Sequence, residues 1–519
     1  MNLNIKKSLS RNMKRTGFGL ATLLSGVLLW NAMTAKAAAP QDLESRVTQQ
    51  TTFEHTYGGT DYDSGASVQQ TSDGGYIIAG MTRSFGAGKN DVYLVKTDAA
   101  GDTLWTRTFG GAENDVGFSV QQTSDGGYIL AGATDSFGAG GNDVFLVKTD
   151  ANGNSLWTTP RTFGGAKSDW AQSVQQVSDG GYIITGVTLS SGAGKNDIYL
   201  IKTDASGNAV WEKTFGGAGL DNGYSVQQVS DGGYVIAGVT QSFGAGTSDF
   251  FLVKTDADGN AVWSRTFGGS KDDTGWSVQQ ASDGGYVIAG GTNSFGAGKW
   301  DFFLVKTDAS GNALWERTFG GVEDDCGFSV QQASDGGYII SGYTASSGAG
   351  KYDVYLVKTD ADGNSLWTRT FGGAEDDIGW AVRQTSDKGY IIAGDTGSFG
   401  AGNNDVYLIK TDASGSTPVE EEDPERIDSF QLFQNYPNPF NLETVIEYQV
   451  PKKSRVTLKV FDMLGREIKT LVDMEEGPGY KTAQWDGRDA DNSIVPSGVY
   501  IYQIRAKDFV QSKKLTVVK

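Results

Sequence analysis

The sequence contains a single cysteine and a single histidine among its 519 residues. Cys326 therefore has no partner within the chain for a disulfide, and one cysteine with one histidine cannot make a zinc site of that ligand type. A Ser-His-Asp or Cys-His arrangement would have to use His55. These scarcities exclude a disulfide-stabilised scaffold and leave few routes to nucleophilic catalysis.

Positive charge is also in short supply. Lys and Arg number 43 against 62 Asp and Glu, so the formal net charge is −19. Nucleic acids and anionic membranes are bound through a basic surface, and the composition therefore predicts neither as a partner. An acidic surface can attract cations, but it more often serves to keep a protein soluble.

Long apolar runs are missing except near the N-terminus. Five basic residues between positions 6 and 15 precede the apolar run Gly17–Trp30, which is followed by small residues up to Ala39. This order is typical of a secretory signal peptide, which we place at residues 1–39, cut near Ala37 or Ala39. An uncleaved anchor is the alternative, although the run is shorter than the ~18 residues that a membrane-spanning helix prefers. No transmembrane segment is expected after cleavage.

Glycine, in contrast, is abundant at 73 residues, and much of it belongs to a repeat. The motif Ser-Asp-Gly-Gly-Tyr begins at Ser72, Ser124, Ser178, Ser230, Ser282 and Ser334, and a seventh copy at Ser386 has Lys388 in place of the first glycine. Successive copies are 52 residues apart, except for 54 between Ser124 and Ser178, where Thr159-Pro160 is inserted as a loop or bulge. A fixed spacing of this length predicts an array of structural units.

Each unit is predicted to form four short strands, A to D. In the unit around Ser230 they are Gly223–Gln228, Tyr234–Gly238, Phe250–Thr255 and Ala261–Thr266, separated by turns rich in Gly, Asp and Asn. Strands B and C are nearly continuous apolar runs, so both of their faces must be covered. A two-layer sandwich would leave one face in water, whereas blades packed around an axis cover both. The all-β unit therefore predicts a β-propeller blade.

Strand counting predicts a closed ring of seven blades at residues 50–415. Tryptophan marks strand D six times, at Trp105, Trp157, Trp211, Trp263, Trp315 and Trp367, but the seventh unit ends without one. At the other end of the array, Thr52–Gly59 aligns with Leu104–Gly111 and places Phe53 where the tryptophan stands. An N-terminal strand should thus complete the last blade and remove an open edge. The array resembles bacterial β-propeller repeat proteins; it departs from the similar kelch repeats because Gly-Gly precedes the second strand, so no kelch function is implied.

The repeat stops before an acidic linker at residues 416–429, and residues 430–519 have a different composition. Six short strands are expected there, at Val445–Val450, Arg455–Phe461, Glu467–Val472, Tyr480–Trp485, Val499–Ala506 and Lys514–Val518. Short alternating strands joined by turns predict a small Ig-like β-sandwich.

The tail also carries ordered motifs at Asn435–Asn441, Val460–Glu467, Trp485–Gly487, Ser497–Tyr500 and Lys513–Lys519. Through them it resembles the C-terminal sorting domain of type IX-secreted proteins, which is related to the Ig-like module of flagellar hook-capping proteins. The resemblance implies export by the signal peptide, recognition of the tail by type IX-like secretion machinery, and a final location in the medium or on the outer cell surface. A purely structural sandwich is the alternative.

In a propeller, the D–A and B–C loops share one face, and the A–B and C–D turns share the other. Among the copies the turns barely change, whereas the B–C loops differ at equivalent positions, namely Arg83, Asp135, Leu189, Gln241, Asn293, Ala345 and Gly397. The D–A loops differ as well. This variation favours ligand contact on that face, and unconstrained loops are the alternative.

Two sets of residues in strand A are candidate ligand-binding positions. An aspartate precedes the strand A valine by five residues in every unit, at Asp63, Asp115, Asp169, Asp221, Asp273, Asp325 and Asp377. Seven carboxylates could ring the channel mouth and bind Ca²⁺. Alternatively, each could accept backbone N–H groups in a structural turn. We predict that the protein has no cofactor, and Ca²⁺ stays the open alternative. Aromatic residues follow at Phe118, Tyr224, Trp276, Phe328 and Trp380 and could stack on sugar rings or pack between blades.

Two functional classes follow. One is a non-enzymatic binding or scaffold protein that engages a polysaccharide or a surface protein, and the other is a carbohydrate-active enzyme, a glycoside hydrolase or lyase with paired carboxylates. Near-identical units offer seven equal environments, whereas catalysis needs a unique one. Departures such as Trp170, Tyr343, Arg383 and Lys388 are scattered over three units and form no recognisable pair. We therefore predict binding and assign no catalytic residue.

Overall fold

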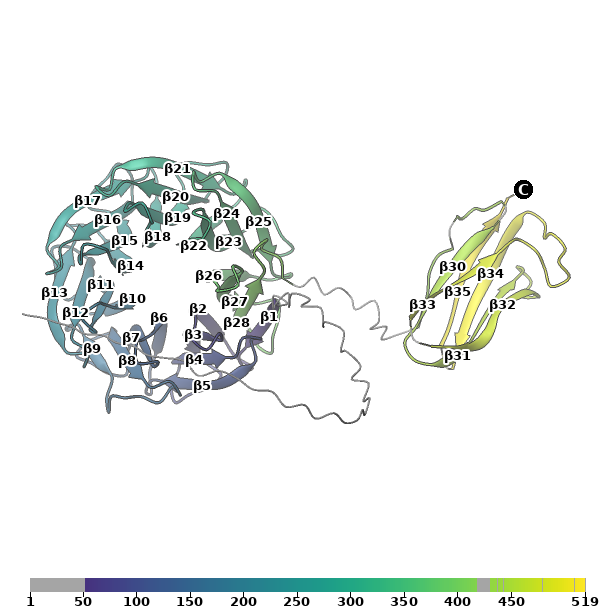
Figure 1. The fold of residues 1–519 in the computed structure, drawn as a ribbon, viewed down its shortest axis with the longest axis horizontal. Coiled ribbons are helices and arrows are strands. Elements are labelled where there is room, and N and C mark those ends of the chain that lie inside the picture. The colour runs from purple at the N-terminus through teal and green to yellow at the C-terminus, as the bar shows by residue number, and fades with distance from the viewer. Residues whose placement is uncertain are drawn as a thin grey trace, which may run out of the picture. The chain divides into compact units, whose positions relative to one another are not determined.

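The computed structural model describes residues 52–417 and 430–518, apart from 436, 442, 478 and 508. The predicted signal peptide and nearly all of the predicted linker lie outside the described residues. Every regular element in the described ranges is a β-strand, as expected for an all-β chain (Figure 1). Within these ranges, no helix is long and apolar enough to cross a membrane.

Seven four-stranded antiparallel sheets are arranged around an axis as the blades of a propeller (Figure 1). Blade 1 consists of β2 (Asp63–Gln70), β3 (Tyr76–Thr82), β4 (Asp91–Thr97) and β5 (Thr103–Phe109). Blade 2 consists of β6 (Asp115–Gln122), β7 (Tyr128–Thr134), β8 (Asp143–Thr149) and β9 (Arg161–Phe163). Blade 3 consists of β10 (Asp169–Gln176), β11 (Tyr182–Thr188), β12 (Asp197–Thr203) and β13 (Ala209–Phe215). Blade 4 consists of β14 (Asp221–Gln228), β15 (Tyr234–Thr240), β16 (Asp249–Thr255) and β17 (Ala261–Phe267). Blade 5 consists of β18 (Asp273–Gln280), β19 (Tyr286–Thr292), β20 (Asp301–Thr307) and β21 (Ala313–Phe319). Blade 6 consists of β22 (Asp325–Gln332), β23 (Tyr338–Thr344), β24 (Asp353–Thr359) and β25 (Ser365–Phe371).

Blade 7 is closed by the N-terminal strand. It consists of β26 (Asp377–Gln384), β27 (Tyr390–Thr396), β28 (Asp405–Thr411) and β1 (Phe53–Tyr57), in the order β1-β28-β27-β26. Phe53 pairs with Lys410 as Trp105 pairs with Lys96 in blade 1, and it is buried at 6% exposure. The predicted ring closure is confirmed, with phenylalanine in the tryptophan position.

The core of the propeller lies between blades. Strand β8 is buried along its whole length, and β3 along nearly all of it, as the continuous apolar runs predicted. One cluster joins Ile77 and Leu94 of blade 1 to Tyr128, Leu130 and Phe145 of blade 2, so each sheet is covered on both faces by its neighbours.

Two differences from the predicted strand boundaries of the propeller have a clear physical cause. The innermost strand starts two residues earlier, at Asp221 instead of Gly223 in blade 4, because the aspartate pairs with Thr240 in the ladder. The outermost strand of blade 2, β9, has only three residues because Thr159-Pro160 interrupts the ladder; Trp157 nevertheless packs against the blade 2–blade 3 core.

The tail forms a separate two-sheet sandwich. One sheet has the order β29 (Gln431–Leu432), β30 (Thr444–Val450), β33 (Gly479–Trp485), and the other has the order β32 (Glu467–Glu476), β31 (Ser454–Phe461), β34 (Gly498–Ala506), β35 (Phe509–Val517). Side chains from both sheets share one core around Trp485, Tyr502 and Ile504. The six expected strands are present, although the last begins at Phe509 instead of Lys514.

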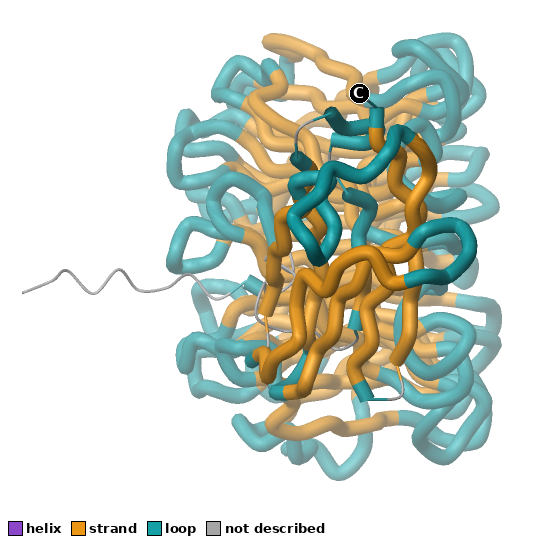
Figure 2. Tube along the Cα trace, turned by 90° about the vertical axis from the view of Figure 1, so that its right-hand side faces the viewer, coloured by secondary structure: helices purple, strands orange, loops and turns teal. Residues whose placement is uncertain are grey.

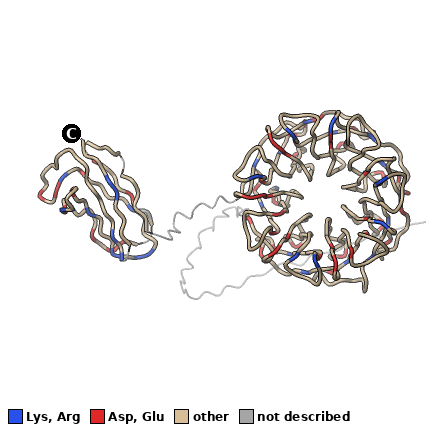
Figure 3. Tube along the Cα trace, turned by 180° about the vertical axis from the view of Figure 1, so that it is seen from behind, with Lys and Arg blue, Asp and Glu red and all other residues tan. Residues whose placement is uncertain are grey.

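The loops of the propeller gather on two opposite faces (Figure 2). We call the face formed by the B–C and D–A loops the loop face, and the face formed by the A–B and C–D turns the turn face. Acidic and basic residues are spread around the whole ring (Figure 3).

Candidate functional site

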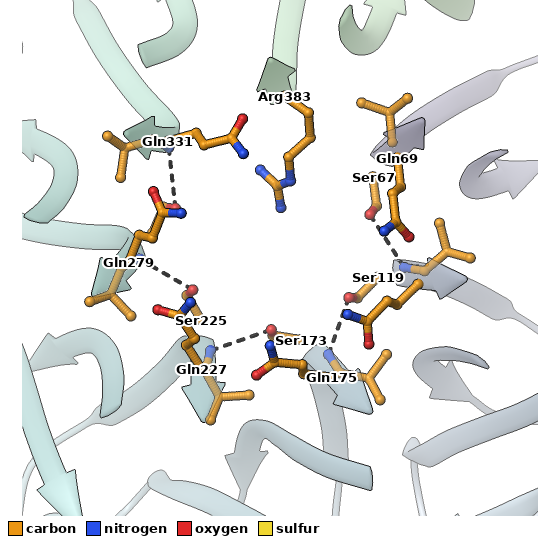
Figure 4. Close-up of a pocket in the computed structure, with 18 of the residues that line it drawn as sticks. Ser67, Gln69, Ser119, Ser173, Gln175, Ser225, Gln227, Gln279, Gln331 and Arg383 are labelled. Atoms are coloured by element: carbon orange, nitrogen blue, oxygen red, sulfur yellow. Dashed lines mark hydrogen bonds between the residues drawn. The ribbon is translucent and has the colours of Figure 1, made fainter. Parts of the chain in front are cut away.

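The central channel is lined by the second half of each innermost strand. In the repeated sequence Ser-Val-Gln-Gln, the valine is buried between blades while the serine and the first glutamine face the axis (Figure 4). These residues enclose a cavity of about 430 Å³ at the end of the channel toward the turn face. The period-2 alternation of a strand thus builds a polar channel from an ordinary propeller core.

Two layers of hydrogen bonds join the blades along this channel. At the six junctions from blade 1 to blade 7, a glutamine side-chain oxygen accepts the N–H of the next blade's second glutamine at 2.5–2.7 Å, the acceptors being Gln69, Gln121, Gln175, Gln227, Gln279 and Gln331. At the same junctions a serine hydroxyl accepts the valine N–H of the next blade at 3.1–3.3 Å, the acceptors being Ser67, Ser119, Ser173, Ser225, Ser277 and Ser329.

The seventh junction, between blades 7 and 1, breaks this pattern. Ala381 replaces the serine and Arg383 replaces the glutamine, and an arginine cannot accept a hydrogen bond. The Nη1 of Arg383 donates to the carbonyl of Val382 at 2.7 Å and to the hydroxyl of Ser329 at 3.3 Å. Burial lowers the pKa of this guanidinium from its usual value. Ala381 and Arg383 thus make the channel asymmetric at this junction, and Arg383 is the charged residue that lines the cavity.

The seven predicted aspartates do not ring an open channel mouth. Each carboxylate is 0% exposed, and its Oδ2 accepts the N–H of a D–A loop glycine at 2.7–2.8 Å in all seven blades. The same oxygen accepts the hydroxyl of a B–C loop serine at 2.5–2.7 Å. The carboxylates hold the two kinds of loop together, which is a version of the structural alternative, and they form no accessible ring.

Glycine is required where these carboxylates approach those of the neighbouring strand. A Cβ on Gly110 would lie 2.2 Å from Oδ1 of Asp91 and 2.7 Å from Oδ2 of Asp115. The first glycine of the repeated Phe-Gly-Gly sequence is therefore needed because a side chain there would collide with two carboxylates. Within the described ranges, no three His, Cys, Asp or Glu side chains are grouped so that they could hold a metal ion.

Four of the five predicted aromatic residues come together on adjacent blades. Tyr224 stacks on Trp276 with ring centroids 4.1 Å apart, Trp276 meets Phe328 edge-on at 5.4 Å, and Phe328 stacks on Trp380 at 4.3 Å. Each is the extra residue of a β-bulge, where the register shifts between the flanking glycine and the next residue. Phe118 lies apart in blade 2, between blades that carry Ala66 and Gln172. The structure shows contact between blades at this arc.

A buried carboxylate that the sequence analysis missed lies next to the end of this arc. Asp395 is 3% exposed and accepts hydrogen bonds from the Trp380 indole, from the Ser64 hydroxyl at 3.1 Å and from the Asn404 amide at 3.4 Å. Burial raises the pKa of its carboxyl to about 6. The available signal was its position, which holds Met, Ala, Val, Gly or Tyr in the other six blades.

The loop face carries half-exposed phenylalanines that also went unnoticed in the sequence. They are the second residue of the Ser-Phe-Gly-Ala-Gly loop in five blades, with exposures of 38–49%, at Phe85, Phe137, Phe243, Phe295 and Phe399. Each lies against an aromatic side chain of its own third strand, with centroids 5.5–6.1 Å apart. Ser191 and Ser347 take their place in blades 3 and 6, so the apolar pattern is uneven around the ring.

The turn face is more tightly built than its repeated sequence suggested. In each blade a buried lysine of the third strand pairs with the turn aspartate at 2.8–3.0 Å, as Lys96 does with Asp73. Near these pairs each of six blades exposes a single Leu or Val at 55–60%. The residue lies in the outermost strand, except for Leu156, which precedes β9, and the six are Leu104, Leu156, Val210, Val262, Leu314 and Leu366. The aspartate of the A–B turn is thus paired with a lysine of its own blade.

Comparison with known proteins identifies the tail. The family described as "Secretion system C-terminal sorting domain" matches residues 434–518, which confirms the resemblance inferred from the motifs. The sorting domain directs this protein to the cell surface or the extracellular space through the type IX secretion system and implies contact with that machinery.

Similarities over the propeller are more distant. Among curated proteins, "Regulatory protein FlaEY" of Caulobacter vibrioides is 29% identical over 181 residues, which are 30% of this chain and 19% of that protein, so the chain spans about a fifth of its length. Among solved structures, PorZ of Porphyromonas gingivalis, a surface component of the type IX secretion system, has a TM-score of 0.39 and 14% identity, covering 90% of this chain and 60% of PorZ. The Pan2 WD40 domain of Neurospora crassa has a TM-score of 0.41 and 10% identity, covering 70% of this chain and 96% of that domain.

Proposed function

We propose that this exported protein is a non-enzymatic binding protein, and that the loop face of its propeller engages a polysaccharide or another surface protein. The observation that carries the proposal is the set of five half-exposed phenylalanines on that face. Exposed aromatic rings suit stacking on sugar rings and apolar contact with a protein.

The mounting of these phenylalanines supports recognition. Each ring is backed by a buried aromatic side chain, and each loop is fixed by the buried aspartate that binds both its serine and the neighbouring glycine, as Asp63 does with Ser84 and Gly59. A surface held in place before binding loses little conformational entropy when a ligand arrives. The uneven distribution, with serine in blades 3 and 6, would give the face a preferred orientation toward its ligand.

The carboxylates favour this function over catalysis. Carboxylates approach one another at equivalent places in the blades, as Asp91 and Asp115 do on either side of Gly110, and they are buried against backbone N–H groups of the loops. Asp395 departs from the repeat, but it is also buried. Paired-carboxylate hydrolysis requires two groups that reach the substrate in one place.

The test combines a glycan array and a screen of outer-surface proteins with a polysaccharide-degradation assay, all on the full exported chain. The double variant Phe85→Ser/Phe399→Ser gives two neighbouring blades the serine that blades 3 and 6 already have, so the fold should be kept. Binding should weaken by about tenfold or more, whereas the turn-face control Leu104→Ser/Leu366→Ser should bind normally. Equal binding by the phenylalanine variant would contradict the proposal, and turnover of a polysaccharide would support the alternative of a carbohydrate-active enzyme.

A further inference from the structure

We propose that the turn-face end of the central channel is an anion-binding site in which Arg383 receives an oxyanion group, a carboxylate, sulfate or phosphate, of a small ligand. The site lies at the opposite end of the strands from the loop face and is independent of the function proposed above. Figure 4 shows the Arg383 side chain reaching toward the middle of the channel between Gln331 and Gln69. The argument rests on its unused hydrogen-bonding capacity, its neighbours and the room beside it.

Arg383 has more donors than partners. Its guanidinium offers five N–H groups, and its hydrogen bonds are those from Nη1 to the Val382 carbonyl and the Ser329 hydroxyl. Among the described residues, no carboxylate lies within ion-pair distance of it. A planar cation with a free donor edge matches the two oxygens of an oxyanion.

The other side chains of the channel wall add donors. In six blades the glutamine oxygen is occupied by a backbone N–H of the next blade, which leaves the carboxamide NH₂ group to face the channel. The serine oxygens likewise accept backbone N–H groups, so their hydroxyl protons are free to donate. No Asp or Glu lines the cavity. A donor-rich pocket therefore lies inside a protein whose net charge is −19.

Size and chemistry narrow the ligand class. A cavity of about 430 Å³ admits a group the size of one sugar ring or a small organic anion. No aromatic side chain lines it, so recognition would depend on charge and hydrogen bonds instead of stacking. A neutral sugar would leave the guanidinium unpaired.

The position of Arg383 costs the ring a contact. A glutamine there would accept the N–H of Gln70, as its six counterparts do at the other junctions, and arginine cannot. A partly buried cation without a counter-ion also opposes folding. Departures from a local rule that lack a structural benefit are concentrated at functional sites.

Isothermal titration calorimetry on the full exported chain tests the proposal, with sulfate, inorganic phosphate and glucuronate as probes, glucose as the neutral control and chloride holding the ionic strength constant. Wild type should bind at least one of the three anions with one equivalent per chain, and the anion that binds best distinguishes a sulfate, phosphate or uronate source. Arg383→Gln should weaken that binding by about 10- to 100-fold. Arg265→Gln, which removes the same charge from the outermost strand of blade 4, should bind as wild type does.

Thermal unfolding separates loss of the site from loss of the fold. Arg383→Gln restores the glutamine of the other blades and should melt at the same temperature as wild type or higher. No binding of any anion by wild type, or undiminished binding by Arg383→Gln, would overturn the assignment. Equal weakening in Arg265→Gln would reduce the effect to net charge and overturn it as well.

Discussion

Asp395 offers the sharpest test of the electrostatics at the junction of blades 7 and 1. It is a single carboxylate on β27 at a position that is otherwise uncharged, and it accepts hydrogen bonds from Trp380, Ser64 and Asn404. Burial, together with the nearby charge of Asp377, raises its pKa from the ordinary 3.8 to about 6, although the three hydrogen bonds oppose that shift. We expect Asp395→Asn to stabilise the protein at neutral pH, because the amide resembles the protonated acid and carries no buried charge.

Proton linkage gives the direction and the size of the expected change in the free energy of unfolding with pH. Since the folded-state pKa exceeds the unfolded-state value, the folded protein holds its proton more tightly, and it loses stability as pH rises through the interval from 3.8 to about 6. Each pKa unit corresponds to about 1.4 kcal/mol, so the full loss is about 3 kcal/mol above pH 7. The stability difference between Asp395→Asn and wild type should therefore rise by up to that amount between pH 4 and pH 7.

Urea denaturation at half-unit steps from pH 4 to pH 8 measures this difference, because every other group titrates equally in both proteins. Asp360→Asn is the control: the Asn364 side chain and backbone donate to that exposed turn carboxylate and lower its pKa. That pKa lies below its unfolded value, so the control should lose stability relative to wild type as pH rises from below 4, and should then stay constant above pH 5. A wild-type-minus-Asp395→Asn difference that is flat from pH 4 to pH 8 would refute the raised pKa.

Three further outcomes are expected. Phe53→Ala removes the buried ring that replaces tryptophan in the closing strand and should lower the free energy of unfolding by about 3–5 kcal/mol in urea denaturation. The control Leu104→Ala, at an exposed position, should lower it by less than about 1 kcal/mol. Similar losses in the two variants would contradict closure of the ring by β1. Asp125→Asn removes the partner of buried Lys148 and should lower the free energy of unfolding by about 1–2 kcal/mol at pH 7. The pKa of Asp125 is lowered to about 2, so this cost should disappear as the pH falls toward 2. A loss that does not depend on pH would rule out the ion pair. Cys326 is buried with its thiol pKa raised to about 12, so a thiol reagent should label it only after denaturation, and rapid labelling of the native protein would place it at the surface instead.

Most of the fold could be predicted from the sequence because the patterns that determine the strands and turns are local and repeated. The apolar runs of strands B and C and the turn glycines occur in almost every copy, and seven copies of one pattern leave little ambiguity. Ring closure was predictable from one alignment, that of Phe53 with the tryptophans. The tail was recognised from ordered motifs, and its family match confirms it.

The candidate sites were much less predictable because they depend on contacts between distant copies. Ser64 donates to Asp395 across 331 residues, and no local pattern indicates that this carboxylate will be buried. The sequence could not decide between an accessible ring and a structural role for the seven aspartates, because their hydrogen-bond partners lie in two different loops, 4 and 21 residues away in the case of Asp63. Arg383 was visible as a departure from the repeat, but its setting exists only once the blades surround a common axis.

The closing strand has a consequence for how the chain reaches its final form. β1 is among the first parts of the propeller to be synthesised, yet its partner β28 begins only at residue 405, so the strand has no correct neighbour while nearly the whole ring is made. During that time blade 7 does not exist, and β1 is a free edge strand of the kind that pairs with other chains. Once two molecules have made their last blades, the β1 of each could pair with the β28 of the other and form a strand-swapped dimer. Chaperoning of the N-terminal segment until the last blade appears would suppress that exchange, so the order of synthesis places the greatest hazard at the very contact that finishes the ring.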